Sequence, residues 1–201
     1  MLLLKKFTAP RDITDEQIKE VKNIYGIKRI PHYFSSLLWA THQMNLSDIE
    51  KQDLGIIYVS HLGPIHQVNK YINDLLTYPP NECSPAFFSH SVFNAPVAFL
   101  TKYMNVQGPS LSVCGFQQII KASVLSAFSW LKTSYCSKVL IIYSDENVDI
   151  SQKISDLTGL QLFQQNHIIL LGSASKEMGE NSLKPDHIIE MITNIYQPEG
   201  I

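Results

Sequence analysis

The sequence predicts an α/β fold, with a mixed, mainly parallel sheet and helices on both of its faces. Three short apolar runs, 54–60, 139–143 and 167–172, are rich in β-branched residues, as strands buried on both sides are. Stretches with apolar residues at helical spacing lie between them. The composition indicates a globular protein with much buried surface and argues against disorder, because 45% of the residues are hydrophobic and 17% are charged. Because 201 residues is about the size of one domain, we expect residues 1–201 to form a single domain.

The first 30 residues predict one strand and one helix. Leu2–Phe7 is an apolar start that suits a strand, and Thr14 can cap a helix that runs to about Tyr25 and stops at Gly26. This segment is also the most basic part of the chain, which makes residues 1–30 a basic N-terminal extension. Its basic residues form either a solvated surface or a docking face for an acidic acyl carrier protein: Lys5, Lys6, Lys19, Lys22, Lys28 and Arg29.

The next segment alternates helix and strand. We predict a helix over 32–44, a polar connection over 48–53, a strand over 54–60 and a helix over 65–76. The strand ends in a loop that contains His61. The second helix is expected to face the core through Val68, Ile72 and Leu75 or Leu76.

The central stretch, 91–146, has the clearest pattern of helix, turn and strand signals. Asn94 can cap a helix with an apolar body, and Gly108-Pro109-Ser110 then breaks the chain. Residues 111–114 suit a short strand, and Gly115 allows a sharp reversal. A long helix over 116–132 follows, with small polar residues between its apolar positions, which indicates packing on several sides.

After the strand at 139–143 the pattern weakens. Residues 147–158 suit a surface helix or loop, and Leu160–Phe163 is a candidate strand. Residues 173–185 are polar, and 187–196 fits either a strand or an amphipathic helix. We therefore interpret 173–201 as a variable tail.

The order of these central features resembles the N-terminal half of β-ketoacyl synthases, the thiolase-fold condensing enzymes of fatty-acid and polyketide synthesis. The preceding stretch Ser84–Ala95, SPAFFSHSVFNA, resembles a short branch of ketosynthase N-terminal-domain-like proteins. Some members of that branch are chain-length-factor-like subunits in aryl polyene gene clusters. The resemblance covers about Phe34 to Gly172. It implies a thiolase-like half fold, with the C-terminal half of that fold absent from this chain.

The resemblance also implies where a catalytic cysteine would stand. In the family, this cysteine lies at the turn into the buried helix, and the position is occupied here by Gln117 or Gln118. A carboxamide cannot form a thioester, and glutamine there resembles the chain length factors. The nearest thiol, Cys114, is an alternative nucleophile with His61 or His90 as its base, or else a small buried residue. The histidine pair that the family uses belongs to the missing half.

The favoured hypothesis is therefore a non-catalytic, chain-length-factor-like subunit. It would pair with a full-length ketosynthase, or with itself, and serve an acyl carrier protein in fatty-acid or polyketide synthesis. The resemblance implies pairing through the short strand Leu111, Ser112, Val113 and Cys114. The helix before Gly108 supplies side chains that either line an acyl pocket or simply pack in the core: Phe99, Leu100, Tyr103 and Met104. The rival is a small acyltransferase or condensing enzyme that uses Cys114, and a third reading is a carrier-protein-binding module without a synthase partner.

Without a second half, the helix over 116–132 would expose several apolar side chains. These are Ile119, Ile120, Val124 and Phe128. Each lost burial would cost about 1.5–3 kcal/mol. We expect a cover from residues 1–29, from the segment after Ser173, or from another chain.

Charge and cysteine content exclude other classes. A net charge of −2 gives no basis for nucleic-acid binding. Three widely spaced cysteines form neither a disulfide framework nor a metal-ligand pattern, and no cofactor motif is present. No apolar run reaches the roughly 20 residues that span a bilayer, and Met1–Lys6 has the wrong charge order for a signal peptide. We expect a cytoplasmic protein.

Overall fold

The computed structural model of the protein describes residues 1–116, 118–173 and 183–196. The strands are β1 (Leu2–Pro10), β2 (Leu54–Ser60), β3 (Ser110–Cys114), β4 (Lys138–Tyr143) and β5 (Gln165–Gly172). The helices are α1 (Asp15–Tyr25), α2 (His32–His42), α3 (Asp48–Gln52), α4 (Ile65–Thr77), α5 (Pro85–Ser91), α6 (Ala95–Met104), α7 (Ile119–Lys132), α8 (Asp149–Thr158) and α9 (Pro185–Tyr196).

In the described residues the strands form one sheet in the order β1-β5-β4-β2-β3. Strands β3, β2 and β4 pair in parallel, whereas β5 pairs antiparallel with both β4 and β1. Four of the five strands therefore run in one direction, and the predicted mixed, mainly parallel sheet is confirmed. Strand β3 lies at one edge of the sheet.

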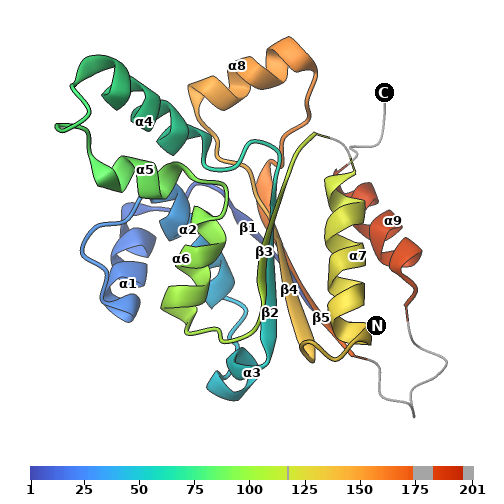
Figure 1. Cartoon of the computed structure of the whole chain (residues 1–201). Helices are drawn as coiled ribbons and strands as arrows, with labels where there is room; N and C mark the ends of the chain where they lie inside the picture. The colour runs from blue at the N-terminus through green and yellow to red at the C-terminus, as the bar shows by residue number, and fades with distance from the viewer. Residues whose placement is uncertain (117, 174–182, 197–201) are drawn as a thin grey trace.

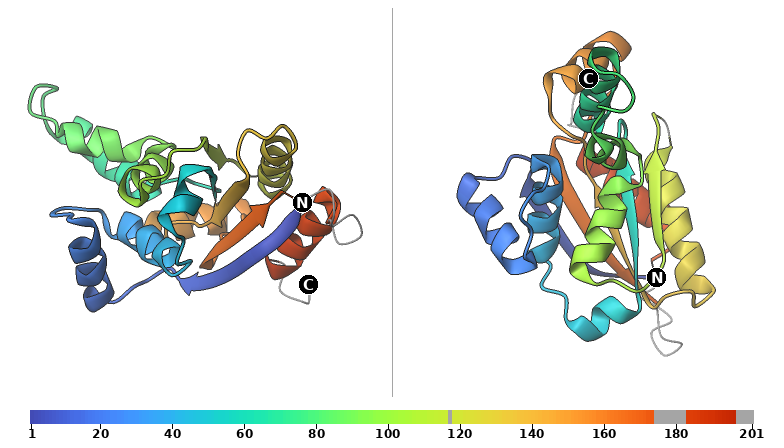
Figure 2. Two further views of the ribbon diagram at one scale, coloured as in Figure 1. Left: turned by 90° about the horizontal axis from the view of Figure 1, so that it is seen from below. Right: turned by 60° about the vertical axis from the view of Figure 1, so that its left-hand side comes forward.

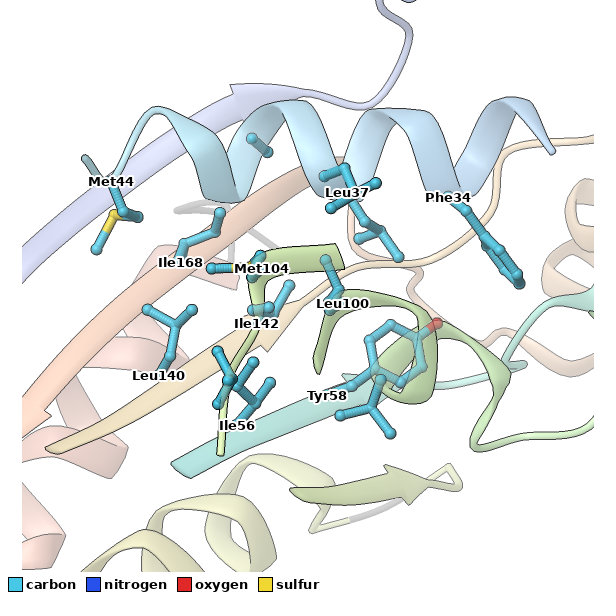
Figure 3. Packing of buried hydrophobic residues seen from close by; sticks show 14 of the residues in the cluster. Phe34, Leu37, Met44, Ile56, Tyr58, Leu100, Met104, Leu140, Ile142 and Ile168 are labelled. Atoms are coloured by element: carbon cyan, nitrogen blue, oxygen red, sulfur yellow. The ribbon is translucent and has the colours of Figure 1, made fainter. Parts of the chain in front are cut away.

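Helices cover both faces of this sheet, as predicted (Figure 1). Helices α1, α2 and α6 lie on one face, and α7 and α9 on the other. Figure 3 shows the first core, in which Phe34 and Leu37 of α2 and Leu100 of α6 pack against side chains of β2, β4 and β5. Full burial of each such side chain contributes about 1.5–3 kcal/mol.

Local signals explain why several elements begin and end where they do. The Thr14 hydroxyl accepts the Gln17 N–H at 3.2 Å, and the Gln17 side chain accepts the Thr14 N–H at 2.8 Å, which closes a capping box at α1. Gly26 ends that helix in the left-handed region, with φ 65°. Gly108 is required by a close approach, since a Cβ there would lie 2.2 Å from the Leu54 carbonyl oxygen.

The predicted inward stripe of α4 is wrong. Ile72 and Leu75 are exposed, and Leu76 is 81% exposed. The buried side chains of this helix are instead Gln67 and Asp74. Both Figure 1 and the right-hand view of Figure 2 place α4 and α8 beyond the end of the sheet, so α4 has no sheet face to cover.

Four other features of the secondary structure differ from the prediction made from the sequence. Leu160–Phe163 is not a strand, because the Phe163 N–H donates to Asp145 instead of joining a ladder. The short helices α3 and α5 were not predicted, and α7 begins at Ile119, three residues later than expected.

The ambiguous segment 187–196 forms most of helix α9, and this helix covers α7 (Figure 1). Ile188 and Ile192 are fully buried in the same core cluster as Val124 of α7, and Met1 joins it from the other end of the chain. The chain itself therefore supplies much of the cover that α7 needs. Leu125 on the same helix remains 43% exposed.

Candidate functional site

Polar groups gather at the carboxyl ends of the parallel strands β2 and β4, where sites of open α/β sheets form. Strand β2 ends at Ser60, which is followed by His61. Strand β4 ends at Tyr143 and is followed by Ser144, Asp145 and Glu146. Apart from His61, which is partly exposed, all of these residues are buried.

Asp145 is the centre of this group, and its side chain is completely buried. One carboxylate oxygen accepts the Ser60 hydroxyl and the His61 backbone N–H, each at 2.7 Å. The other oxygen accepts the Phe163 N–H at 2.9 Å and lies 2.7 Å from His61 Nδ1. A buried carboxylate with this many donors holds three separate segments of the chain together.

The His61 ring has a fixed orientation. Because an ionised carboxylate only accepts hydrogen bonds, Nδ1 donates to Asp145 and Nε2 lies on the opposite side of the ring. The ring also packs on Phe163, with centroids 4.5 Å apart. It lines a cavity of about 220 Å³ whose other lining residues are Phe116, Ile120, Leu160, Gln161, Leu162, Phe163 and Thr193.

Glu146 forms a second buried acidic group beside the first. It accepts the His66 backbone N–H at 2.7 Å, and burial raises the pKa of its carboxyl to about 7. Glu146 and Asp145 help to line a cavity of about 180 Å³ that also includes Arg11 and Tyr33. A larger cleft of about 640 Å³ lies between α4 and α8 and includes His66.

The predicted nucleophile positions lie at the turn from β3 into α7. Gln117 lies outside the described residues. Gln118 is exposed and occupies the position before α7 with φ 58°. Cys114 is the nearest thiol, and burial, with a further contribution from Asp145, raises the pKa of this thiol to about 11.

The two histidines proposed as partners for Cys114 are placed differently, and His90 contacts Phe34 of the core against which Cys114 packs. Leu111 and Val113 pack into the core under α7, whereas Cys114 packs against the opposite core, since strand side chains alternate. His61 lines the cavity beside Ile120 of α7, and His90 contacts the Phe34 ring edge-on. In the described part of the chain, no hydrogen bond joins Cys114 to either histidine.

Strand β3 has a pairing partner on one side only, within the residues the structure describes. The Ile56 N–H donates to the Pro109 carbonyl at 2.9 Å, and the Gly115 N–H donates to the Ser60 carbonyl at 3.4 Å. Backbone groups of a parallel strand point alternately to either side, so Ser112 directs its N–H and carbonyl to the open edge. Its buried side-chain oxygen has no hydrogen-bond partner among the described residues.

The predicted acyl-pocket residues lie on α6. Leu100 and Met104 are buried in the core that Figure 3 shows. Phe99 and Tyr103 are partly buried beside it, with ring centroids 4.4 Å apart. Asn94 stands at the predicted cap of α6, although its side chain makes no capping hydrogen bond. The three cavities described above are lined by other residues.

Sequence reasoning missed Asp145. The signal was present, because Ser-Asp-Glu directly follows an apolar strand at an edge of the sheet where polar groups converge. For the residues described, no group of His, Cys, Asp and Glu side chains is arranged to hold a metal ion. Of the helices described, none is long and apolar enough to cross a membrane.

Comparison with solved structures finds chains of similar fold. A chain of the ketosynthase ApeO in complex with its chain length factor ApeC from Xenorhabdus doucetiae is 16% identical, with a TM-score of 0.61 over 87% of this chain and 79% of that one. A chain of the ishigamide ketosynthase/chain length factor is 13% identical, with a TM-score of 0.65 over 78% of this chain and 48% of the other. A chain of the complex AntDE:AntF, a type II PKS acyl-carrier protein with its ketosynthase bound to the hexaketide, is 9% identical, with a TM-score of 0.62 over 85% of this chain and 62% of that one.

The likeness is to part of the longer chains. This chain spans about half the length of the ishigamide chain and of a beta-ketoacyl synthase from Burkholderia phymatum, which is 8% identical with a TM-score of 0.57 over 88% of this chain. None of the curated proteins compared with the chain matches it. A family model described as the beta-ketoacyl synthase N-terminal domain matches residues 37–155, more than half of the chain. The protein belongs to the beta-ketoacyl synthase N-terminal domain family.

Proposed function

We propose that the chain is a non-catalytic, chain-length-factor-like subunit that pairs with a catalytic β-ketoacyl synthase. It would act with an acyl carrier protein in fatty-acid or polyketide synthesis of the aryl polyene type. Its contribution is to complete the synthase dimer and to wall the tunnel of the growing acyl chain with α6. Three free cysteines support a reducing compartment such as the cytoplasm.

The observation that carries this proposal is the open edge of β3. A strand that pairs on one side only, as β3 does among the described residues, and that directs N–H and carbonyl groups outward is a template for a strand of another chain. Pairing of β3 across a two-fold axis with the corresponding strand of a synthase would extend the sheet into the partner. Two of the solved structures of similar fold are ketosynthases together with their chain length factors, which supports a partner of this kind.

The thiol chemistry supports a role without catalysis. A thiol with its pKa raised to about 11 holds roughly one part in ten thousand as thiolate at pH 7, and the thiolate is the nucleophile. Cys114 also packs on the face of the sheet opposite the His61 cavity.

Co-expression with full-length ketosynthases from the same genome tests the proposal. We expect one of them to co-purify with this chain as a 1:1 complex, measured by size-exclusion chromatography with light scattering. A chain that remains a folded monomer beside every ketosynthase contradicts the proposal. If the complex forms but does not support acyl-chain elongation, the synthase is a partner of this chain and the proposed role in chain length is contradicted.

A further inference from the structure

The cavity beside His61 has the features of a small-molecule site. Most of its lining is apolar: Phe116, Ile120, Leu160, Leu162 and Phe163. Its volume of about 220 Å³ exceeds the roughly 150 Å³ of an apolar cavity that accommodates benzene. The described lining residues include no lysine or arginine, so the cavity does not suit phosphates.

One oriented polar atom faces this apolar space. Nδ1 of His61 is bound to the buried Asp145, so Nε2 is the nitrogen that the ring can present to the cavity. Among the described residues, Nε2 has no hydrogen-bond partner. Solvent reaches Nε2, since it is not among the fully buried side-chain atoms without a partner, so a bound donor would take the place of water at this acceptor.

The support of this atom is rigid. Asp145 binds both the backbone and the ring of His61, and it also binds the N–H of Phe163, on which the ring packs. The ring therefore cannot turn away without breaking a fully buried hydrogen-bond group. Binding sites for small molecules have this composition, with an apolar wall and few fixed polar groups.

We propose that this cavity binds a small aromatic or branched apolar group that bears one hydroxyl, and that the hydroxyl donates its hydrogen bond to His61 Nε2. The other polar groups of the lining place no charge in the cavity. The Thr193 hydroxyl already donates to the Ile189 carbonyl at 2.8 Å, and the Gln161 side chain belongs to an exposed residue. The proposal concerns this chain alone and does not depend on its pairing with a synthase.

Phenol and toluene form a matched pair of probes, because they differ in the hydroxyl that the proposal requires. Each is titrated into the full chain while the ring nitrogens of its histidines are followed by NMR. We expect saturable binding of phenol that is about tenfold tighter than that of toluene, with a shift of the His61 signals. The signals of His90, which lies against Phe34 of the other core, should not move.

Two variants locate the binding. His61→Asn keeps an amide donor for Asp145 and removes the ring acceptor, so phenol should bind no better than toluene. Ile120→Trp fills the cavity and should abolish binding of both probes, whereas Leu125→Trp on the exposed side of the same helix should bind phenol as the parent chain does. Equal affinity for the two probes, or phenol binding that survives Ile120→Trp, overturns the proposal. If His61→Asn does not fold, the probe pair and the tryptophan variants still decide the question.

Discussion

At the scale of single residues, the buried carboxylate of Asp145 joins several segments of the chain by hydrogen bonds. Its carboxylate binds a serine hydroxyl, two backbone N–H groups and a histidine ring while its own side chain has no exposure. We expect Asp145→Asn to lower the free energy of unfolding by about 2–5 kcal/mol, because the amide cannot accept on both of its heteroatoms. Urea denaturation measures the loss, with the exposed Asp149→Asn as the control. A variant as stable as its parent would mean that the Asp145 hydrogen bonds have no net effect.

Glu146 gives the fold a pH dependence of defined sign. Burial raises the pKa of its carboxyl from the ordinary 4.5 to about 7, against the opposing effects of the His66 N–H, Lys70 and Gln67. Between these values the folded chain holds a proton that the unfolded chain releases, so stability falls as pH rises from about 4.5 to about 7.

The variant Glu146→Gln isolates this effect, since glutamine does not titrate. Relative to the variant, the parent should lose about 3 kcal/mol of stability across that interval and change little above it. Chemical denaturation of both proteins at a series of pH values measures the difference. A difference that does not depend on pH would contradict the raised pKa.

At the scale of elements, strand β3 gives the most direct test of assembly. Proline at 112 removes an N–H that points to the open edge and leaves the hydrogen bonds to β2 in place. We expect Ser112→Pro to weaken the complex with a synthase by roughly 30–100-fold while the chain stays folded, because ladder hydrogen bonds across the interface are lost. Binding measured by calorimetry gives the affinity. Ser112→Ala, which loses only the hydroxyl, is the matched control, and equal affinity of the two variants would argue against pairing through β3.

The elements also show what the sequence could specify. Strands β2, β4 and β5 and helix α1 were predictable, because buried strands are continuously apolar and α1 has both of its capping signals. The stripe of α4 was not, because Ile72 and Leu76 have the spacing of a core-facing helix while α4 lies beyond the sheet. Helical periodicity reports which side of a helix is apolar, and only tertiary contacts decide whether that side is covered.

The same limit applies to the site. The position of Cys114 at the end of β3 was predictable from the break at Gly108 and the turn at Gly115. Its orientation was not, because a shift of one residue in a strand exchanges the two faces. The convergence of His61 and Asp145 required the parallel pairing of β2 with β4, which joins segments 84 residues apart in the sequence.

At the scale of the whole molecule, α9 changes the argument for a partner. The central helix of the fold was expected to need a cover from residues 1–29, from the segment after Ser173 or from another chain, and Ile188 and Ile192 of the segment after Ser173 cover much of it. The edge of the sheet remains a reason for assembly, and exposed apolar side chains also remain on α4, α5 and α7, such as Leu76, Phe88 and Leu125. A chain that can bury its own core and still offers a strand edge is suited to reversible pairing.

The last prediction separates a subunit from an enzyme. Exposed to acyl-CoA or to an acylated carrier protein, the isolated chain should show no covalent acyl adduct by intact-mass analysis, because its nearest thiol, Cys114, is only half-buried but has a pKa raised to about 11. In the presence of a synthase partner, any adduct should lie on the partner. An adduct on this chain that disappears in Cys114→Ser and persists in Cys136→Ser, which alters a buried thiol, would identify Cys114 as a nucleophile and favour a small condensing enzyme or acyltransferase.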